Sequence, residues 1–134
     1  MRTTSRTAGL AAALVVTLGT ACPAAAADDW GTLDRIGSSR LQACKVPVDG
    51  EAWRIKLRLA TDEVRAKGTL RVFRGDQPTD RRWRSRWVPP HSTSDVGAVR
   101  VPRGQHRWRF LTGVTTDGAG SSSFGQSAAA VNRC

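Results

Sequence analysis

Hydrophobic and basic side chains alternate through much of this chain. In the stretch WRIKLRL, residues 53–59, apolar side chains take every second position and basic side chains take the positions between them. The stretches VRAKGTLRV, residues 64–72, and HRWRFLTGV, residues 106–114, repeat this arrangement. A period of two over six or more residues is typical of a strand that buries one face, and helical spacing fits none of these stretches better. The alternation therefore predicts an all-β protein.

Turn-forming sequences such as Asp-Gly and Pro-Pro separate these runs. They divide the chain into about seven predicted strands, near residues 40–48, 52–60, 64–74, 82–88, 95–101, 106–115 and 123–133. The alanines of the last segment could instead form a short helix, and residues 30–39 could be an edge strand or a helical turn. We expect the strands at 52–60 and 64–74 to pair as a hairpin. Short strands at this spacing predict an antiparallel β-sandwich.

One cysteine and one tryptophan add a resemblance to this prediction. Cys44 followed by Trp53 resembles the cysteine and core tryptophan of immunoglobulin domains, and the number of strands agrees. The resemblance implies an immunoglobulin-like sandwich architecture. The chain departs from that family because it has no tyrosine, and hence no tyrosine corner, and because its second cysteine is the last residue.

The first 27 residues have the layout of a secretory signal peptide. Arg2 and Arg6 precede an apolar run at residues 10–19, which is shorter than the ~20 residues that a spanning helix needs. Small residues at 24–27 then provide a cleavage site, and we predict cleavage after Ala27. The protein is therefore expected to be secreted.

Cleavage at that bond would leave one domain, residues 28–134, with no transmembrane segment. The minor alternative is a lipoprotein anchor at Cys22, in the sequence LGTAC. That motif has a large aliphatic residue three places before the cysteine, and Gly19 stands there in this chain.

The mature chain would keep two cysteines, Cys44 and Cys134. An exported domain with two cysteines most often pairs them, so we predict a disulfide bond between them. The bond would close a ring of roughly 90 residues and would stabilise the fold by about 4–5 kcal/mol in the chain-entropy model.

Positive charge is concentrated in the middle of the chain. The whole sequence carries a net charge of +10, and residues 64–109 hold 12 basic and 3 acidic residues. Such a surplus favours a polyanionic partner. Arginine outnumbers lysine heavily, so part of the surplus can equally reflect biased codon usage.

The stretch RRWRSRWVP, residues 81–89, is the densest part of this block. Read as a strand, it would point its two tryptophans and Ser85 into the core and its alternate arginines outward. Proteins that bind single-stranded nucleic acid need aromatic platforms beside their basic groove. Because the aromatic and basic side chains are expected on opposite faces, we do not expect intracellular nucleic acid to be the partner.

The outward arginines are expected to form one basic plate, in which the two central strands lie side by side. The candidate polyanion-binding residues are Arg54, Arg58, Arg65, Arg71, Arg82, Arg84, Arg86, Arg107 and Arg109. The functional hypothesis is a secreted, non-catalytic, basic domain that binds an anionic cell-surface polymer or another polyanion. The competing interpretation is a solvated strand face with no ligand.

Two other hypotheses remain open. One is a secreted protein-interaction or inhibitor domain that acts through a loop such as 74–80 or 89–95. The other, which the residues support least, is a small hydrolase around His91, because HSTSD at 91–95 brings histidine, serine and aspartate close together in sequence only. No nucleotide, cofactor or metal-binding motif occurs in the chain, so no cofactor or metal site is predicted.

Overall fold

The structure is a computed structural model that describes residues 28–103 and 107–134. The expected signal peptide, residues 1–27, and His106 lie outside these described residues. The elements are β1 (Gly31–Ile36), β2 (Ser39–Val48), β3 (Ala52–Ala60), β4 (Ala66–Arg74), β5 (Gln77–Arg84), β6 (Gly97–Pro102), β7 (Trp108–Thr116), β8 (Gly120–Ser127) and a 3-10 turn, η1 (Ala128–Ala130). No helix among the described residues is long and apolar enough to span a membrane.

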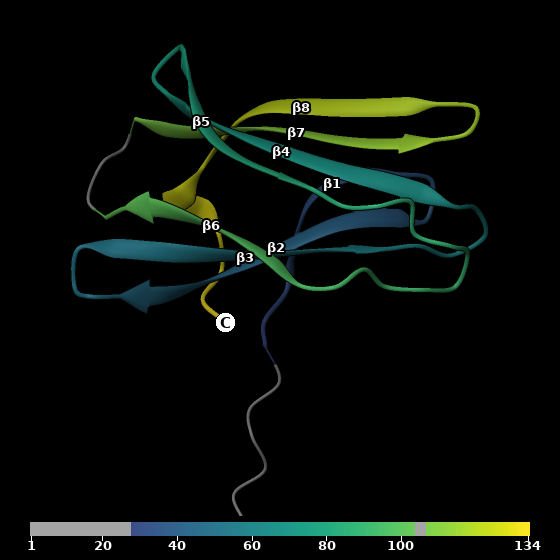
Figure 1. The fold of residues 1–134 in the computed structure, drawn as a ribbon, viewed down its shortest axis with the longest axis horizontal. Helices are drawn as coiled ribbons and strands as arrows, with labels where there is room; N and C mark the ends of the chain where they lie inside the picture. Colours follow the sequence, from purple (N-terminus) through teal and green to yellow (C-terminus); the bar gives the residue numbers. More distant parts are fainter. Residues whose placement is uncertain (1–27, 104–106) are drawn as a thin grey trace, which may run out of the picture.

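The strands form two antiparallel sheets of four strands each. The first sheet has the order β1-β2-β3-β6 and the second has the order β5-β4-β7-β8. Figure 1 shows the two sheets stacked as separate layers, with the chain crossing from one to the other. The predicted all-β sandwich is therefore confirmed.

The core lies between the two sheets and is built from the apolar halves of the alternating stretches. Ile55 and Leu57 from β3 face Leu70 and Val72 from β4 and Phe110 from β7, and each of these side chains is exposed by 1% or less. The charged halves of the same strands point to solvent. The alternation in the sequence therefore predicts correctly which side of these strands is buried.

The predicted hairpin between residues 52–60 and 64–74 is wrong. β3 pairs with β2 and β6, whereas β4 pairs with β5 and β7 in the other sheet. Residues 61–65 carry the chain across the sandwich, and at their start the Thr61 hydroxyl bonds the carbonyls of Pro89 and Ser92. Because the apolar faces of β3 and β4 meet in the core, their basic faces point in opposite directions.

Two of the predicted strands differ clearly from the sequence interpretation, and one open alternative is decided. The strand predicted at 82–88 begins earlier, as β5. The segment predicted as a strand over 123–133 divides into β8 and the 3-10 turn η1, so the alternative of a short helix at the alanines applies to its second half. The segment 30–39 contains an edge strand, β1.

The predicted disulfide between Cys44 and Cys134 is present. It holds the C-terminal tail beside β2, where the Lys45 amide donates to the carbonyl of Asn132 and the Cys134 amide donates to the carbonyl of Lys45. The last residues are therefore fixed by one covalent bond and two backbone hydrogen bonds.

The cysteine and tryptophan do not adopt the immunoglobulin arrangement. Cys44 stands directly opposite Lys56 on the outer side of the first sheet, whereas Trp53 belongs to the inner side. The two side chains therefore project from opposite faces of the same sheet.

Candidate functional site

The predicted basic plate is divided between the two outer faces of the sandwich. Arg54 and Arg58 lie on the outer face of the first sheet, while Arg71, Arg82 and Arg84 lie on the outer face of the second sheet. This division is a direct consequence of placing β3 and β4 in different sheets. One continuous plate is therefore not formed.

The second sheet gathers four of the predicted residues on its outer side. We call Arg71, Arg82, Arg84 and Arg109 the arginine face. Arg82 stands directly opposite Arg71 across the β4–β5 ladder, and Arg84 stands opposite Thr69. Arg109 lies on β7 opposite Phe73 of β4. All four arginine side chains are exposed.

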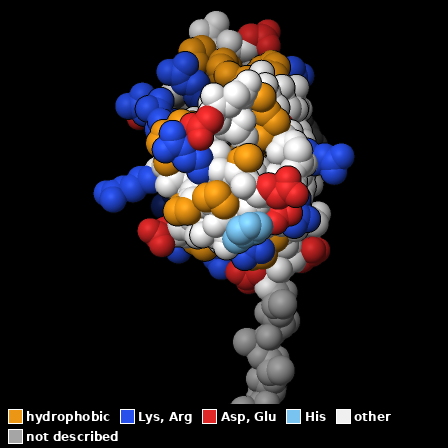
Figure 2. All heavy atoms as spheres, turned by 90° about the vertical axis from the view of Figure 1, so that its right-hand side faces the viewer, with side chains coloured by type: hydrophobic (Ala, Val, Ile, Leu, Met, Phe, Trp, Pro, Cys, Tyr) orange, Lys and Arg blue, Asp and Glu red, His pale blue; other side chains and the backbone are white. Residues whose placement is uncertain are grey.

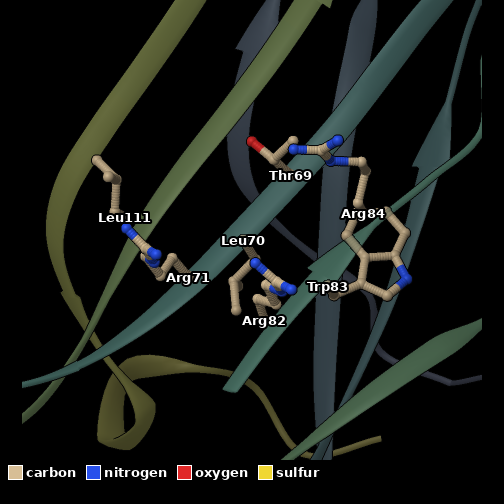
Figure 3. A pocket seen from close by; sticks show the side chains of 7 residues that line it. All are labelled: Thr69, Leu70, Arg71, Arg82, Trp83, Arg84 and Leu111. Carbon is tan, nitrogen blue, oxygen red and sulfur yellow. The ribbon is translucent and has the colours of Figure 1, made fainter. Parts of the chain in front are cut away.

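A shallow groove of about 680 Å³ runs over the β4–β5 part of this face. Figure 3 shows the guanidinium groups of its arginines spread over the neighbouring strands, with that of Arg84 close to Thr69. The residues that line the groove are Thr69, Leu70, Arg71, Arg82, Trp83, Arg84 and Leu111. None of them is acidic, so the groove presents positive charge without a counter-charge of its own.

The arginine face is not neutralised by neighbouring carboxylates. The ion pairs within residues 28–103 and 107–134 join Lys56 to Asp28, Arg65 to Asp117, His91 to Asp62 and Arg100 to Asp49. None of them includes a member of the arginine face. Like charges directly opposite one another in a sheet are destabilising, so the juxtaposition of Arg82 and Arg71 costs the fold some stability.

The basic residues of the first sheet are placed differently. The Nε of Arg58 donates to the side chain of Gln42 at 3.0 Å, and its guanidinium lies 4.2 Å from the centre of the Trp30 ring. Lys56 pairs with Asp28 at 3.2 Å, and Arg100 reaches Asp49 at 3.4 Å. Half of the six basic residues on this face, Lys56, Arg58 and Arg100, therefore have a partner within the chain. Like charges also meet here, because Arg54 stands opposite Arg100.

The remaining predicted residues lie at the ends of the sandwich. Arg65 makes two hydrogen bonds to the carboxylate of Asp117, at 2.7 and 2.9 Å, and these bonds hold the pKa of Asp117 below its usual range. Arg86 follows β5 and is exposed, and Arg107 is exposed just before β7. These three arginines do not join the arginine face.

Trp83 and Trp87, both expected in the core, have different surroundings. Trp83 packs against the core between Gly68 of β4 and Gly97 of β6. Trp87 is 43% exposed, so its assignment to the core is wrong.

The physical reason for the exposure of Trp87 is a break in the alternation. Ser85 is buried, but the next buried side chain is Val88, which pairs with Ala66 through two backbone hydrogen bonds. The interval from 85 to 88 is odd, and a shift of one residue moves a strand's side chains to the opposite face. Trp87 is consequently turned towards solvent.

Beside Trp87 lies a second depression, which we call the edge notch. It has a volume of about 360 Å³ and is lined by Trp83, Arg84, Ser85, Arg86, Trp87, Val88, Pro89, Thr93, Ser94, Asp95, Val96 and Gly97. Figure 2 views the end of the sandwich that carries the loops around 61–65 and 89–96, and it shows exposed hydrophobic side chains beside a group of basic ones. Sequence reasoning missed this site because it treated the whole stretch 82–88 as one regular strand.

The geometry around His91 does not assemble a catalytic triad. The Nδ1 atom of His91 lies 3.2 Å from Asp62, and both side chains are largely exposed. The hydroxyls of Ser92 and Ser94 donate to backbone carbonyls, those of Pro90 and Asp95. His91 lines neither the groove nor the edge notch.

A cationic cluster surrounds Trp53 at the opposite end of the sandwich. Lys45, Arg103 and Arg133 approach its ring, with cation-to-centroid distances of 4.9, 4.4 and 5.3 Å. The Nζ atom of Lys45 also donates to two carbonyls of η1. Burial, and secondarily the charge of Arg133, lowers the pKa of Lys45.

Comparisons with known proteins do not identify a relative: no family model, no curated protein and no solved structure matches the chain. The immunoglobulin-like resemblance therefore remains a prediction about architecture.

Proposed function

We propose that this protein is a secreted, non-catalytic module that binds extracellular polyanions through the arginine face. The expected partner is an anionic polymer at a cell surface. Export remains an inference from the N-terminal sequence, and the disulfide is compatible with an oxidising compartment.

One observation carries the proposal. Arg82 stands directly opposite Arg71, beside Arg84, in a groove that contains no acidic side chain. A polyanion would supply the counter-charge that the chain itself lacks there. Binding would also release the small counterions that otherwise accompany the two partners, which is a favourable term at low salt.

The test is salt-dependent retention of the purified, oxidised protein on immobilised dextran sulfate. We expect the parent protein to be retained at low salt and released as the salt concentration rises. The variant with Arg71→Glu, Arg82→Glu and Arg84→Glu should elute at much lower salt. Its folding should change little, because all three side chains are exposed.

A matched control is available on the first sheet. Arg35, Arg40 and Arg54 are exposed on its outer face and belong to none of the ion pairs of the described residues, and changing all three to glutamate alters the net charge by the same amount. We expect this control variant to keep most of the retention. An equal loss in both variants would show that net charge alone governs binding, and a parent protein that is not retained at low salt would refute the proposal.

A second candidate function is recognition of another protein through the loop at 89–95. It is favoured by the exposed apolar side chains of Trp87 and Val96, which flank this loop and are 43% and 55% exposed. In that case retention on dextran sulfate would be an incidental property of a basic surface. A hydrolase around His91 has no comparable support.

A further inference from the structure

The groove of the arginine face and the edge notch adjoin one another. The edge notch opens where β5 leaves the second sheet, and its lining shares Trp83 and Arg84 with the groove. Its volume of about 360 Å³ lies at the lower end of the range of about 300–1,000 Å³ for clefts that hold small ligands. A chain-like ligand can therefore cross the arginine face and place one of its units in the edge notch.

The wall of the edge notch includes an aromatic side chain that is held in position. The guanidinium of Arg65 lies 5.0 Å from the centre of the Trp87 ring, and Arg65 is itself fixed by its two hydrogen bonds to Asp117. Nearly half of Trp87 nevertheless remains open to solvent. An exposed, oriented indole can pack against a ring of a ligand, either the C–H face of a sugar or a planar base.

The polar lining of the edge notch combines both signs of charge. Arg84 and Arg86 contribute exposed guanidinium groups, and Asp95 contributes an exposed carboxylate. None of the ion pairs in the described part of the chain includes any of these three residues. A carboxylate accepts hydrogen bonds from hydroxyl groups and repels anionic groups. The ligand unit in the edge notch should therefore carry hydroxyl groups as well as negative charge.

From these features we infer that the anionic polymer is an acidic polysaccharide and that the edge notch binds one of its sugar units. This inference rests on the proposed function and names its ligand class. The C–H face of the sugar ring packs on Trp87, and its hydroxyls donate to Asp95. The acidic groups of that unit and its neighbours pair with Arg84, Arg86 and the arginine face.

A nucleic acid fits the same features less well. A base can stack on one tryptophan, but sequence-tolerant binding of single strands uses several aromatic platforms along a basic groove. An internal deoxynucleotide also has no free hydroxyl group that could donate to Asp95. Single-stranded DNA is therefore the competing outcome that the experiment has to separate.

The experiment compares three probes against the purified, oxidised protein at one ionic strength: oligogalacturonate, linear polyphosphate and oligo-dT of matched charge. Polyphosphate carries charge without rings or hydroxyls. We expect Trp87→Ala to weaken oligogalacturonate binding about tenfold and to leave polyphosphate binding within about twofold of the parent. Trp87→Phe, which keeps an aromatic ring, should retain most of the affinity for oligogalacturonate.

Two further variants sharpen the comparison. Asp95→Ala should lower the ratio of the affinities for oligogalacturonate and polyphosphate, since it removes repulsion of both anions but removes a hydrogen-bond acceptor that only the sugar hydroxyls use. Phe124→Ala is the matched control, because Phe124 is 49% exposed on β8 and lines neither the groove nor the edge notch. It should change neither affinity.

The outcomes separate this inference from the proposed function. If the parent binds both anions and Trp87→Ala changes neither affinity, the inference is overturned and polyanion binding stands. If Trp87→Ala weakens oligo-dT binding more than oligogalacturonate binding, the ligand class is wrong. If the parent binds none of the three probes, both proposals fall.

Discussion

Replacing Gly97 with alanine tests directly how the Trp83 indole packs between the two sheets. A Cβ atom at this position would overlap the five-membered ring of the Trp83 indole, at Nε1 and Cδ1. The indole cannot retreat towards β4, because a Cβ on Gly68 would already lie 3.0 Å from its other ring. The indole is thus held between two glycine backbones, one from each sheet. In the Gly97→Ala variant it has to swing outward or push β6 away.

The cost follows from the surface that the indole would lose. A tryptophan buries about 150–250 Å², which is worth about 4–6 kcal/mol at ~25 cal/mol per Å². If the displaced ring loses about half of this burial, the penalty is about 2–3 kcal/mol. Replacing glycine also restricts the unfolded chain, which returns about 0.4–1 kcal/mol. We therefore expect a net loss of about 2 kcal/mol, or a fall in Tm of about 10 °C for a domain of this size.

The measurement is equilibrium urea unfolding of the oxidised protein, followed by far-ultraviolet circular dichroism. Gly118→Ala is the matched control, since nothing lies within 4 Å of a Cβ there and its backbone is not left-handed. It should be neutral or slightly stabilising. The double variant Trp83→Ala, Gly97→Ala completes a cycle that isolates the contact. If Gly97→Ala behaves like Gly118→Ala, or if its cost persists in the absence of the indole, the packing described for Trp83 is refuted.

Two further predictions concern stability. Replacing both Cys44 and Cys134 with alanine should lower the free energy of unfolding by up to about 4–5 kcal/mol in urea titrations, and a loss below about 1 kcal/mol would mean that backbone bonds alone fix the tail. The lowered pKa of Lys45 means that the unfolded chain, titrating near 10.5, binds more protons than the folded chain between the two pKa values. The free energy of unfolding should therefore rise with pH between the two pKa values. The Lys45→Met variant should not show this rise. A parent protein whose urea midpoint does not change with pH in this range would contradict the burial of the Lys45 ammonium group.

The alternation in the sequence predicts the buried side of each strand but not the sheet to which the strand belongs. β3 and β4 have equally regular patterns, and the short connection between them is compatible with a hairpin or with a crossing. In the structure the chain crosses from the first sheet to the second between β3 and β4. Arg54 and Arg71 therefore lie on opposite outer faces, although both occupy outward positions in alternating stretches. The outward direction of these arginines was predictable from the sequence, but the division of the predicted basic plate between two faces was not.

Trp87 illustrates the other limit of the same reasoning. Its position relative to Trp83 indicates a shared face only if the strand continues without interruption. Val88 pairs with Ala66 and is the next buried residue after Ser85, so the interval between the two buried residues is odd and the alternation is broken. Nothing in the sequence of residues 84–88 indicates this break. The prediction that aromatic and basic side chains lie on opposite faces therefore holds for Trp83 and fails for Trp87. This one-residue shift is what turns Trp87 towards solvent, where it lines the edge notch.

The choice between a functional and a merely solvated basic surface depends on the comparison of the two outer faces. Both sheets must present polar side chains to water, so arginines on either face need no ligand to explain them. On the first face Arg54 stands opposite Arg100, but Arg100 and Lys56 each have a carboxylate partner within the chain. On the second face, Arg82 opposes Arg71 and no acidic residue lines the groove. Codon bias would affect both faces equally, so it does not explain why the ion pairs of the described residues include basic side chains of the first face and none that line the groove of the second.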